Sequence, residues 1–142
     1  IRPWQHVLDS LHGYLQLAES LVRDGTASAE AWNFGPGDAS AINVAQLATR
    51  LSDLWGGDAA WQLESVHQPP ESRTLKLDAS KARRDLGWQP VLPLEETLRF
   101  VVAWYRAHHA GQDMRTFTLQ QIEAFEVLAA SKHEQDLVHA AH

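Results

Sequence analysis

Two short runs near the middle of the chain read Leu77-Asp78-Ala79-Ser80-Lys81-Ala82 and, three residues later, Leu86-Gly87-Trp88-Gln89-Pro90. Asp78 is of a residue type that caps helix N-termini, and Gly87 is of a type that ends helices. The pattern therefore predicts a short helix over residues 79–86. Trp88 follows that helix, and large aromatic side chains in such positions more often belong to a core than to a ligand site.

The N-terminal side of this segment predicts one long helix and one strand. Apolar residues recur at helical spacing between Leu11 and Gly25, and either Asp9 or Ser10 is placed to cap the helix. Residues 30–34 resemble a short strand, which Gly35-Pro36-Gly37 would end. The inward face of the helix is expected to consist of Leu11, Tyr14, Leu15, Ala18, Leu21 and Val22.

The remaining elements are predicted in the same way. Helices are expected over residues 41–55, 92–105 and 118–129, and strands over residues 60–66 and 73–77. Thr118 and Gln121 form a capping-box pattern at the start of the last helix. Tyr105 is expected to face inward, and the polar tail after Lys132 is expected to fray. The result is a helix-rich α/β pattern with a few short strands.

Composition limits the possible functions. The 142 residues carry a net charge of −6, include six tryptophans and contain no cysteine. Without a basic stripe the chain does not fit sequence-independent nucleic-acid binding, and without cysteine it has no disulfide or thiolate site. No apolar run is long enough to cross a membrane. We expect a cytoplasmic protein with no membrane partner.

Several self-contained active sites are excluded by missing motifs. The sequence has neither a Gly-x-Gly-x-x-Gly loop nor a Walker loop, so nothing predicts that this chain alone holds NAD. Tyr14 and Tyr105 are not followed at the fourth position by lysine. The eight histidines show no zinc spacing with a supporting carboxylate. We therefore expect no catalytic residue, no bound cofactor and no metal site in this chain.

Three local patterns together resemble a known family. Residues 2–9 read Arg-Pro-Trp-Gln-His-Val-Leu-Asp, residues 31–36 read Ala-Trp-Asn-Phe-Gly-Pro, and residues 77–90 contain an Asp-x-x-Lys and a Leu-Gly-Trp-x-Pro. In this order they resemble signatures of extended short-chain dehydrogenases that act on nucleotide sugars. The resemblance implies the C-terminal, substrate-binding part of a Rossmann-type α/β fold, without its NAD-binding half.

Further features are similar to the CDP-glucose 4,6-dehydratases within that family. These features are the particular residues found in the patterns 2–9 and 31–36, and the segments 113–115 and 118–125. The resemblance covers residues 1–126. It implies an intact enzyme, a lyase that uses NAD to convert CDP-glucose to CDP-4-keto-6-deoxyglucose, a precursor for deoxysugars of surface polysaccharide such as lipopolysaccharide O-antigen. The intact enzyme is expected to be a homo-oligomer.

The same resemblance implies a substrate site. The arginine matching Arg2 contacts the substrate diphosphate in related enzymes, and guanidinium groups suit phosphate oxygens. In the loop 68–73, Glu71 takes the position of the ribose contact. Gln68 stands where wider relatives have arginine, so Arg73 is the candidate for a second phosphate contact. The alternative for Arg2 is an exposed terminal arginine, and for the loop a rigid Pro-Pro turn.

The extent of the chain raises its own expectations. It begins with Ile1, and its only methionine is Met114, so we expect a fragment of a longer protein that is inactive alone. Residues 1–126 would form the nucleotide-sugar-binding region and residues 127–142 a helical tail. Two alternatives remain open: another nucleotide-sugar epimerase or dehydratase, and a non-catalytic helical interaction module.

Overall fold

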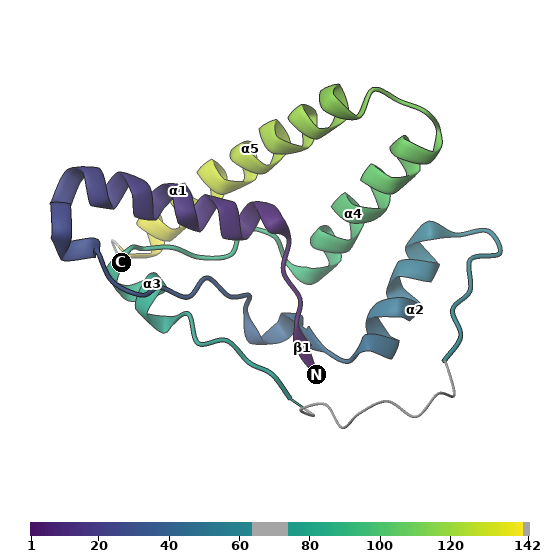
Figure 1. The fold of residues 1–142 in the computed structure, drawn as a ribbon, viewed down its shortest axis with the longest axis horizontal. Coiled ribbons are helices and arrows are strands. Elements are labelled where there is room, and N and C mark those ends of the chain that lie inside the picture. The colour runs from purple at the N-terminus through teal and green to yellow at the C-terminus, as the bar shows by residue number, and fades with distance from the viewer. Residues whose placement is uncertain (64–73, 141–142) are drawn as a thin grey trace. The chain divides into compact units, whose positions relative to one another are not determined.

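The structure is a computed structural model that describes residues 1–63 and 74–140, with side chains through residue 135 (Figure 1). The chain divides into two compact units, Ile1–Val102 and Ala103–His142. Among the described residues, none of the helices combines the length and apolar character that a membrane span requires.

The first unit is mainly helical, as predicted, but its strands differ from the prediction. The described strands are β1 (Arg2–Pro3) and β2 (Ala41–Ile42), which pair antiparallel with Arg2 opposite Ile42. Residues 30–34, 60–63 and 74–77 form no strand, so the strand predictions are wrong for these described residues. A strand needs a ladder of hydrogen bonds to a neighbour, and the bond from the Leu75 N–H to the Ile1 oxygen at 3.1 Å does not by itself form one.

Helix α1 (Val7–Asp24) confirms the predicted N-terminal helix and starts earlier than expected. Its cap is His6, whose Nδ1 accepts the Leu8 backbone N–H at 3.2 Å. The predicted cap at Asp9 or Ser10 is wrong because both lie inside the helix. Gly25 ends the helix as predicted, with a φ of 63° that favours glycine.

The predicted inward face of α1 is also wrong. Asp9, Gly13 and Ser20 are its buried residues, and they lie on one side of the helix. On the other side Leu15 is 66% exposed and Val22 89% exposed. Gly13 explains the orientation in part, since a Cβ there would lie 2.4 Å from the Phe34 ring. The helix therefore approaches the core through small and polar residues.

The main core of the first unit is built around Trp88, which is fully buried. Its ring meets the edge of Phe34 at 5.2 Å between centroids. Ala79 and Ala82 complete the buried cluster, and Leu17, Trp32 and Leu86 pack against it. This confirms Trp88 as a core residue. By analogy with other buried tryptophans, truncation to alanine would cost about 3–5 kcal/mol.

Two further helices of this unit follow their predicted signals. Helix α2 (Val44–Trp55) begins with a capping box between Asn43 and Gln46 and ends at Gly56. Helix α3 (Ser80–Asp85) lies within the predicted range 79–86, and Asp78 Oδ1 accepts the Ser80 backbone N–H at 2.8 Å. Asp78 therefore stabilises the helix start, as predicted, and Gly87 follows its end with a φ of 65°.

Helix α4 (Leu94–His109) extends from the first unit into the second, and α5 (Met114–Ala140) forms most of the latter. Asp113 begins α5 by accepting the backbone N–H groups of Arg115 and Thr116. The predicted capping box at Thr118 is wrong, since Thr118 lies within the helix and accepts a hydrogen bond from Trp104 Nε1 at 3.0 Å. Helix α5 continues to Ala140, beyond the predicted end at residue 129. Tyr105 was expected to face inward, but it is exposed.

Candidate functional site

The three motifs that suggested the family lie together in the first unit. The Asn33 side chain donates to the Asp78 backbone oxygen at 3.2 Å, which joins the second motif to the third. Lys81 forms an ion pair with Glu30 and donates to the Ala31 oxygen at 3.1 Å. These contacts connect residues about 50 positions apart, so the motif residues build a common local framework.

Lys81 also lies over an aromatic face. Its Nζ is 4.2 Å from the centroid of the Trp32 ring, a geometry suited to a cation–π contact. Trp32 is held in turn by a hydrogen bond from Nε1 to the Ser28 oxygen at 3.0 Å. The lysine of the Asp-x-x-Lys motif therefore connects α3 to the segment 30–32.

Asp9 connects the first motif to the third. Its Oδ1 accepts the backbone N–H of Val91 at 2.6 Å and that of Leu92 at 3.4 Å. Its backbone oxygen accepts from Trp88 Nε1 at 3.3 Å. Asp9 is 1% exposed, and carboxylates buried to this degree require such partners. Asp9 therefore holds the segment 88–92 on α1.

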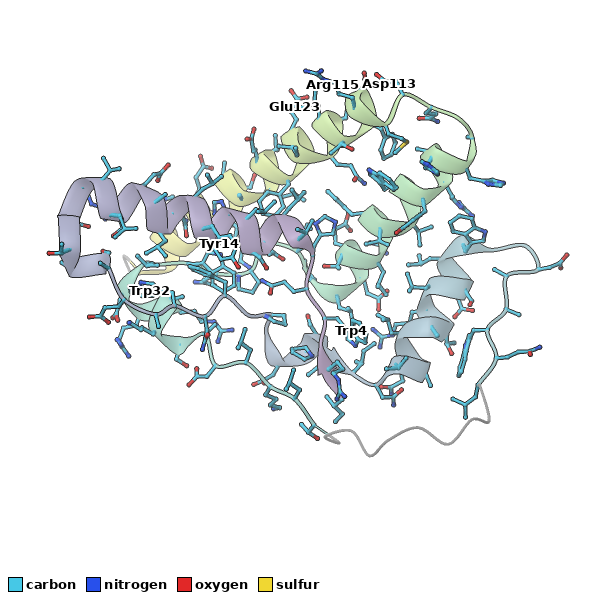
Figure 2. The ribbon with its side chains drawn as sticks, viewed as in Figure 1. Trp4, Tyr14, Trp32, Asp113, Arg115 and Glu123 are labelled. Carbon is cyan, nitrogen blue, oxygen red and sulfur yellow. The ribbon has the colours of Figure 1, made fainter. Side chains whose placement is uncertain are left out.

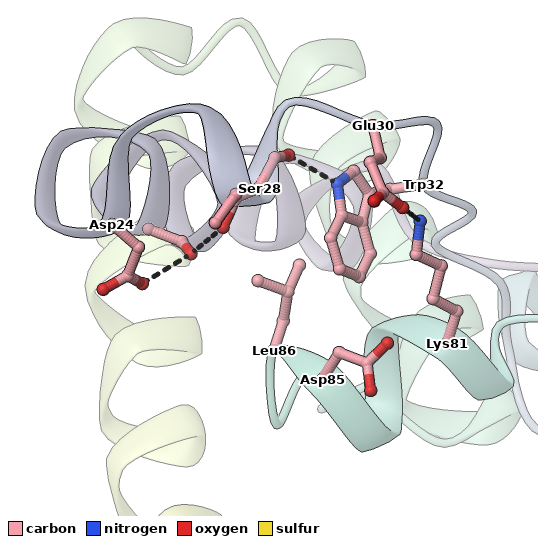
Figure 3. A pocket seen from close by; sticks show the side chains of 9 residues that line it. Asp24, Ser28, Glu30, Trp32, Lys81, Asp85 and Leu86 are labelled. Atoms are coloured by element: carbon pink, nitrogen blue, oxygen red, sulfur yellow. Dashed lines mark hydrogen bonds and ion pairs between the residues drawn. The ribbon is translucent and has the colours of Figure 1, made fainter.

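A cavity of about 330 Å³ opens beside this framework (Figure 3). Trp32 and Leu86 give it an apolar wall, and Lys81 lies at its edge with Glu30. Its lining residues are Ser20, Asp24, Ala27, Ser28, Glu30, Trp32, Lys81, Asp85 and Leu86. The hydroxyls of Ser20 and Ser28 lie 2.6 Å apart.

Two carboxylates of this cavity, those of Asp24 and Asp85, have a lowered pKa. A hydrogen bond from Arg23 lowers the pKa of Asp24, and a hydrogen bond from Arg84 lowers the pKa of Asp85. Neither group suits the role of a proton donor at neutral pH. Each of the three carboxylates of the cavity is paired with a cation: Asp24 with Arg23, Asp85 with Arg84, and Glu30 with Lys81.

Of the predicted substrate residues, Arg2 is described and is partly buried in β1. Its Nη1 donates to the Ile1 oxygen at 3.0 Å. Gln68, Glu71 and Arg73 lie outside the described residues. The first described residues after them return to β1, since the Leu75 N–H donates to the Ile1 oxygen at 3.1 Å.

Trp4 fixes the strand that carries Arg2 (Figure 2). Its Nε1 donates to the Ile42 oxygen at 3.1 Å, and its backbone N–H donates to the Ser40 oxygen at 3.3 Å. Trp4 is thus partly buried and engaged with the β2 segment. In the described part of the chain, no group of three or more His, Asp or Glu residues could hold a metal ion.

Sequence reasoning missed the role of Asp9. Asp9 belongs to a family pattern, which was a signal for a special role, but its position near a helix start suggested a cap. Its partners are 82 and 83 residues away, and local spacing carries no information about them.

Comparison with known proteins places the chain among enzymes of nucleotide sugars. No protein-family model matches it. It is 33% identical over 106 residues to UDP-glucuronic acid decarboxylase 1 of Xenopus tropicalis, covering 74% of this chain and 23% of that protein. It is 28% identical over 112 residues to dTDP-glucose 4,6-dehydratase of Streptomyces griseus, covering 78% and 31%. The chain is homologous to part of the sugar-nucleotide dehydratases and epimerases, which confirms the predicted resemblance.

A more specific similarity is to the CDP-glucose 4,6-dehydratase of Salmonella typhimurium. The chain is 43% identical to it over 125 residues, which cover 88% of this chain and 35% of that enzyme. The chain thus spans about a third of the length of the curated relatives that it matches.

Proposed function

We propose that this chain forms the substrate-binding side of a CDP-glucose 4,6-dehydratase. The observation that carries the proposal is the 43% identity over 88% of the chain to the Salmonella enzyme. The structure supports it through the contacts among the three family motifs, since Asp9, Asn33 and Lys81 all bond to another motif or its continuation. In this proposal the C-terminal part of a Rossmann-type enzyme corresponds to residues 1–126.

The proposed substrate site is centred on Arg2. Its guanidinium group would bind the diphosphate, with Arg73 as the second phosphate contact and Gln68 beside it. Glu71 would accept hydrogen bonds from the ribose hydroxyls.

The proposed reaction removes one water from CDP-glucose and gives CDP-4-keto-6-deoxyglucose. NAD would be held by another part of the intact enzyme. The sequence of this chain contains neither a Gly-x-Gly-x-x-Gly loop nor a Walker loop. The contribution of this chain is therefore to bind and orient the nucleotide sugar.

A related activity on another nucleotide sugar is the second candidate. The 33% identity to a UDP-glucuronic acid decarboxylase favours it, because that identity extends over 74% of the chain. The two candidates share the diphosphate and ribose contacts and differ in the base and in the fate of the sugar.

Turnover by the intact enzyme separates them. The enzyme is supplied with NAD and, in parallel, with CDP-glucose, dTDP-glucose or UDP-glucuronic acid, and products are identified by mass spectrometry. We expect CDP-glucose to lose one water. Turnover of dTDP-glucose and of UDP-glucuronic acid should be slower. Release of carbon dioxide from UDP-glucuronic acid, or faster dehydration of dTDP-glucose, would favour the second candidate.

A further inference from the structure

His6 lies between β1 and α1, and its side chain caps the start of α1, which is unusual for a histidine. Helix caps are generally Ser, Thr, Asp or Asn, whose oxygens accept hydrogen bonds at any ordinary pH. Here the acceptor is the His6 ring, whose Nδ1 lies 3.2 Å from the Leu8 backbone nitrogen. Only an unprotonated Nδ1 can accept this bond, so the cap requires the neutral ring.

The surroundings of His6 disfavour the charged ring. The ring is partly buried and meets the edge of Phe100 in α4 at 5.6 Å between centroids. It also lies at the N-terminus of an 18-residue helix, where the backbone dipoles oppose a positive charge. Burial lowers the pKa of His6 below its ordinary value of 6.5.

The charged groups on the helices around His6 make hydrogen bonds to other residues. Asp9 bonds to Val91 and Leu92, and on α4 Arg99 donates to Glu96 at 3.0 Å. The lowered pKa of His6 is accordingly caused by burial, without a contribution from a charged neighbour.

We propose that His6 is a proton-sensitive cap, which fixes the first turn of α1 when neutral and releases it when protonated. Protonation would break the bond to Leu8 and place a charge against the positive end of the helix. The released residues would be the first turn of α1, which lies four residues beyond β1. This inference stands independently of the proposed function.

The direction of the pH effect follows from the lowered pKa. Between the folded and the unfolded pKa of His6, the unfolded chain binds more protons. The stabilisation by the cap is therefore complete above a pH of about 6.5 and decreases as the pH falls through that window.

Hydrogen exchange of the Leu8 amide, corrected for the intrinsic effect of pH, tests the cap. In the unmodified chain we expect protection to fall about fivefold as the His6 ring titrates, equivalent to loss of a typical cap. His6→Asn should retain protection across the range, because asparagine caps without titrating. In His6→Ala, protection of the Leu8 amide should be low at every pH, as it is in the unmodified chain when the His6 ring is protonated.

A substitution of His12, which lies within α1, separates titration of His6 from titration of this second histidine. The pKa of His12 is also lowered by burial, so His12→Gln should leave the Leu8 transition in place. The proposal is overturned if Leu8 protection stays constant through the His6 titration, or if His6→Asn loses protection as the unmodified chain does.

Discussion

Asp9 connects helix α1 to the segment 88–92 within the first unit. Its carboxylate bonds to the backbone of the segment after Trp88, and its backbone oxygen bonds to the Trp88 ring. A hydrogen-bond acceptor in a buried position is costly to disturb, because its donors then lose a partner away from water. The family motif at residues 2–9 is therefore at least partly a folding motif.

We expect Asp9→Asn to lower the free energy of unfolding by about 1–3 kcal/mol, since asparagine replaces one carboxyl oxygen by an NH₂ group and so introduces donors that the site does not need. Chemical denaturation of the chain measures this change. Asp38→Asn is the control, because Asp38 is exposed and its pair with Lys76 is a surface ion pair. The control should change stability by less than about 0.5 kcal/mol. Equal losses in both variants would contradict the assigned role of Asp9.

Among the elements, the helices could be predicted from the sequence and the strands could not. The ends of three helices could be predicted from glycines in the sequence. Gly25, Gly56 and Gly87 each follow a helix and have a positive φ. A strand depends on a partner, and the segment 30–34 has no neighbouring strand in the described part of the chain. Of the candidate site, Arg2 could be selected from the family resemblance, whereas its place in β1 and the grouping of Asp9 with Val91 required the folded chain.

The orientation of α1 shows the same limit. Apolar spacing located the helix correctly but assigned the wrong side to the core. The α1 stripe, defined as Val7, Leu11, Tyr14, Leu15 and Val22, is exposed. A stripe of this kind is typical of a surface that another part of a protein covers.

Matched leucine substitutions test this orientation. Leu15→Ala in the chain should change the free energy of unfolding by less than about 0.5 kcal/mol, because Leu15 is 66% exposed. Leu98→Ala should cost about 2–5 kcal/mol, because Leu98 is 4% exposed. Both positions are helical, so the difference reports burial. A similar large loss at Leu15 would show that the stripe faces a core.

For the molecule as a whole, sequence identity and structure support complementary parts of the account. Identity to the Salmonella enzyme supports the substrate class, and the structure shows how the shared motifs hold one another. The sequence contains no Gly-x-Gly-x-x-Gly loop. We therefore propose that this chain contacts the nucleotide sugar, and that NAD is held elsewhere in the intact enzyme.

The most direct test measures CDP-glucose and NAD binding to the intact enzyme by calorimetry, with Arg2→Ala and Glu71→Gln. Each substitution removes a charge-assisted hydrogen bond, so the dissociation constant for CDP-glucose should rise about tenfold while that for NAD stays unchanged. Arg115→Ala, at an exposed arginine of α5, should leave both constants unchanged. Unaltered CDP-glucose binding in both site variants, or an equal loss of NAD binding, would contradict the assignment of this chain to the substrate.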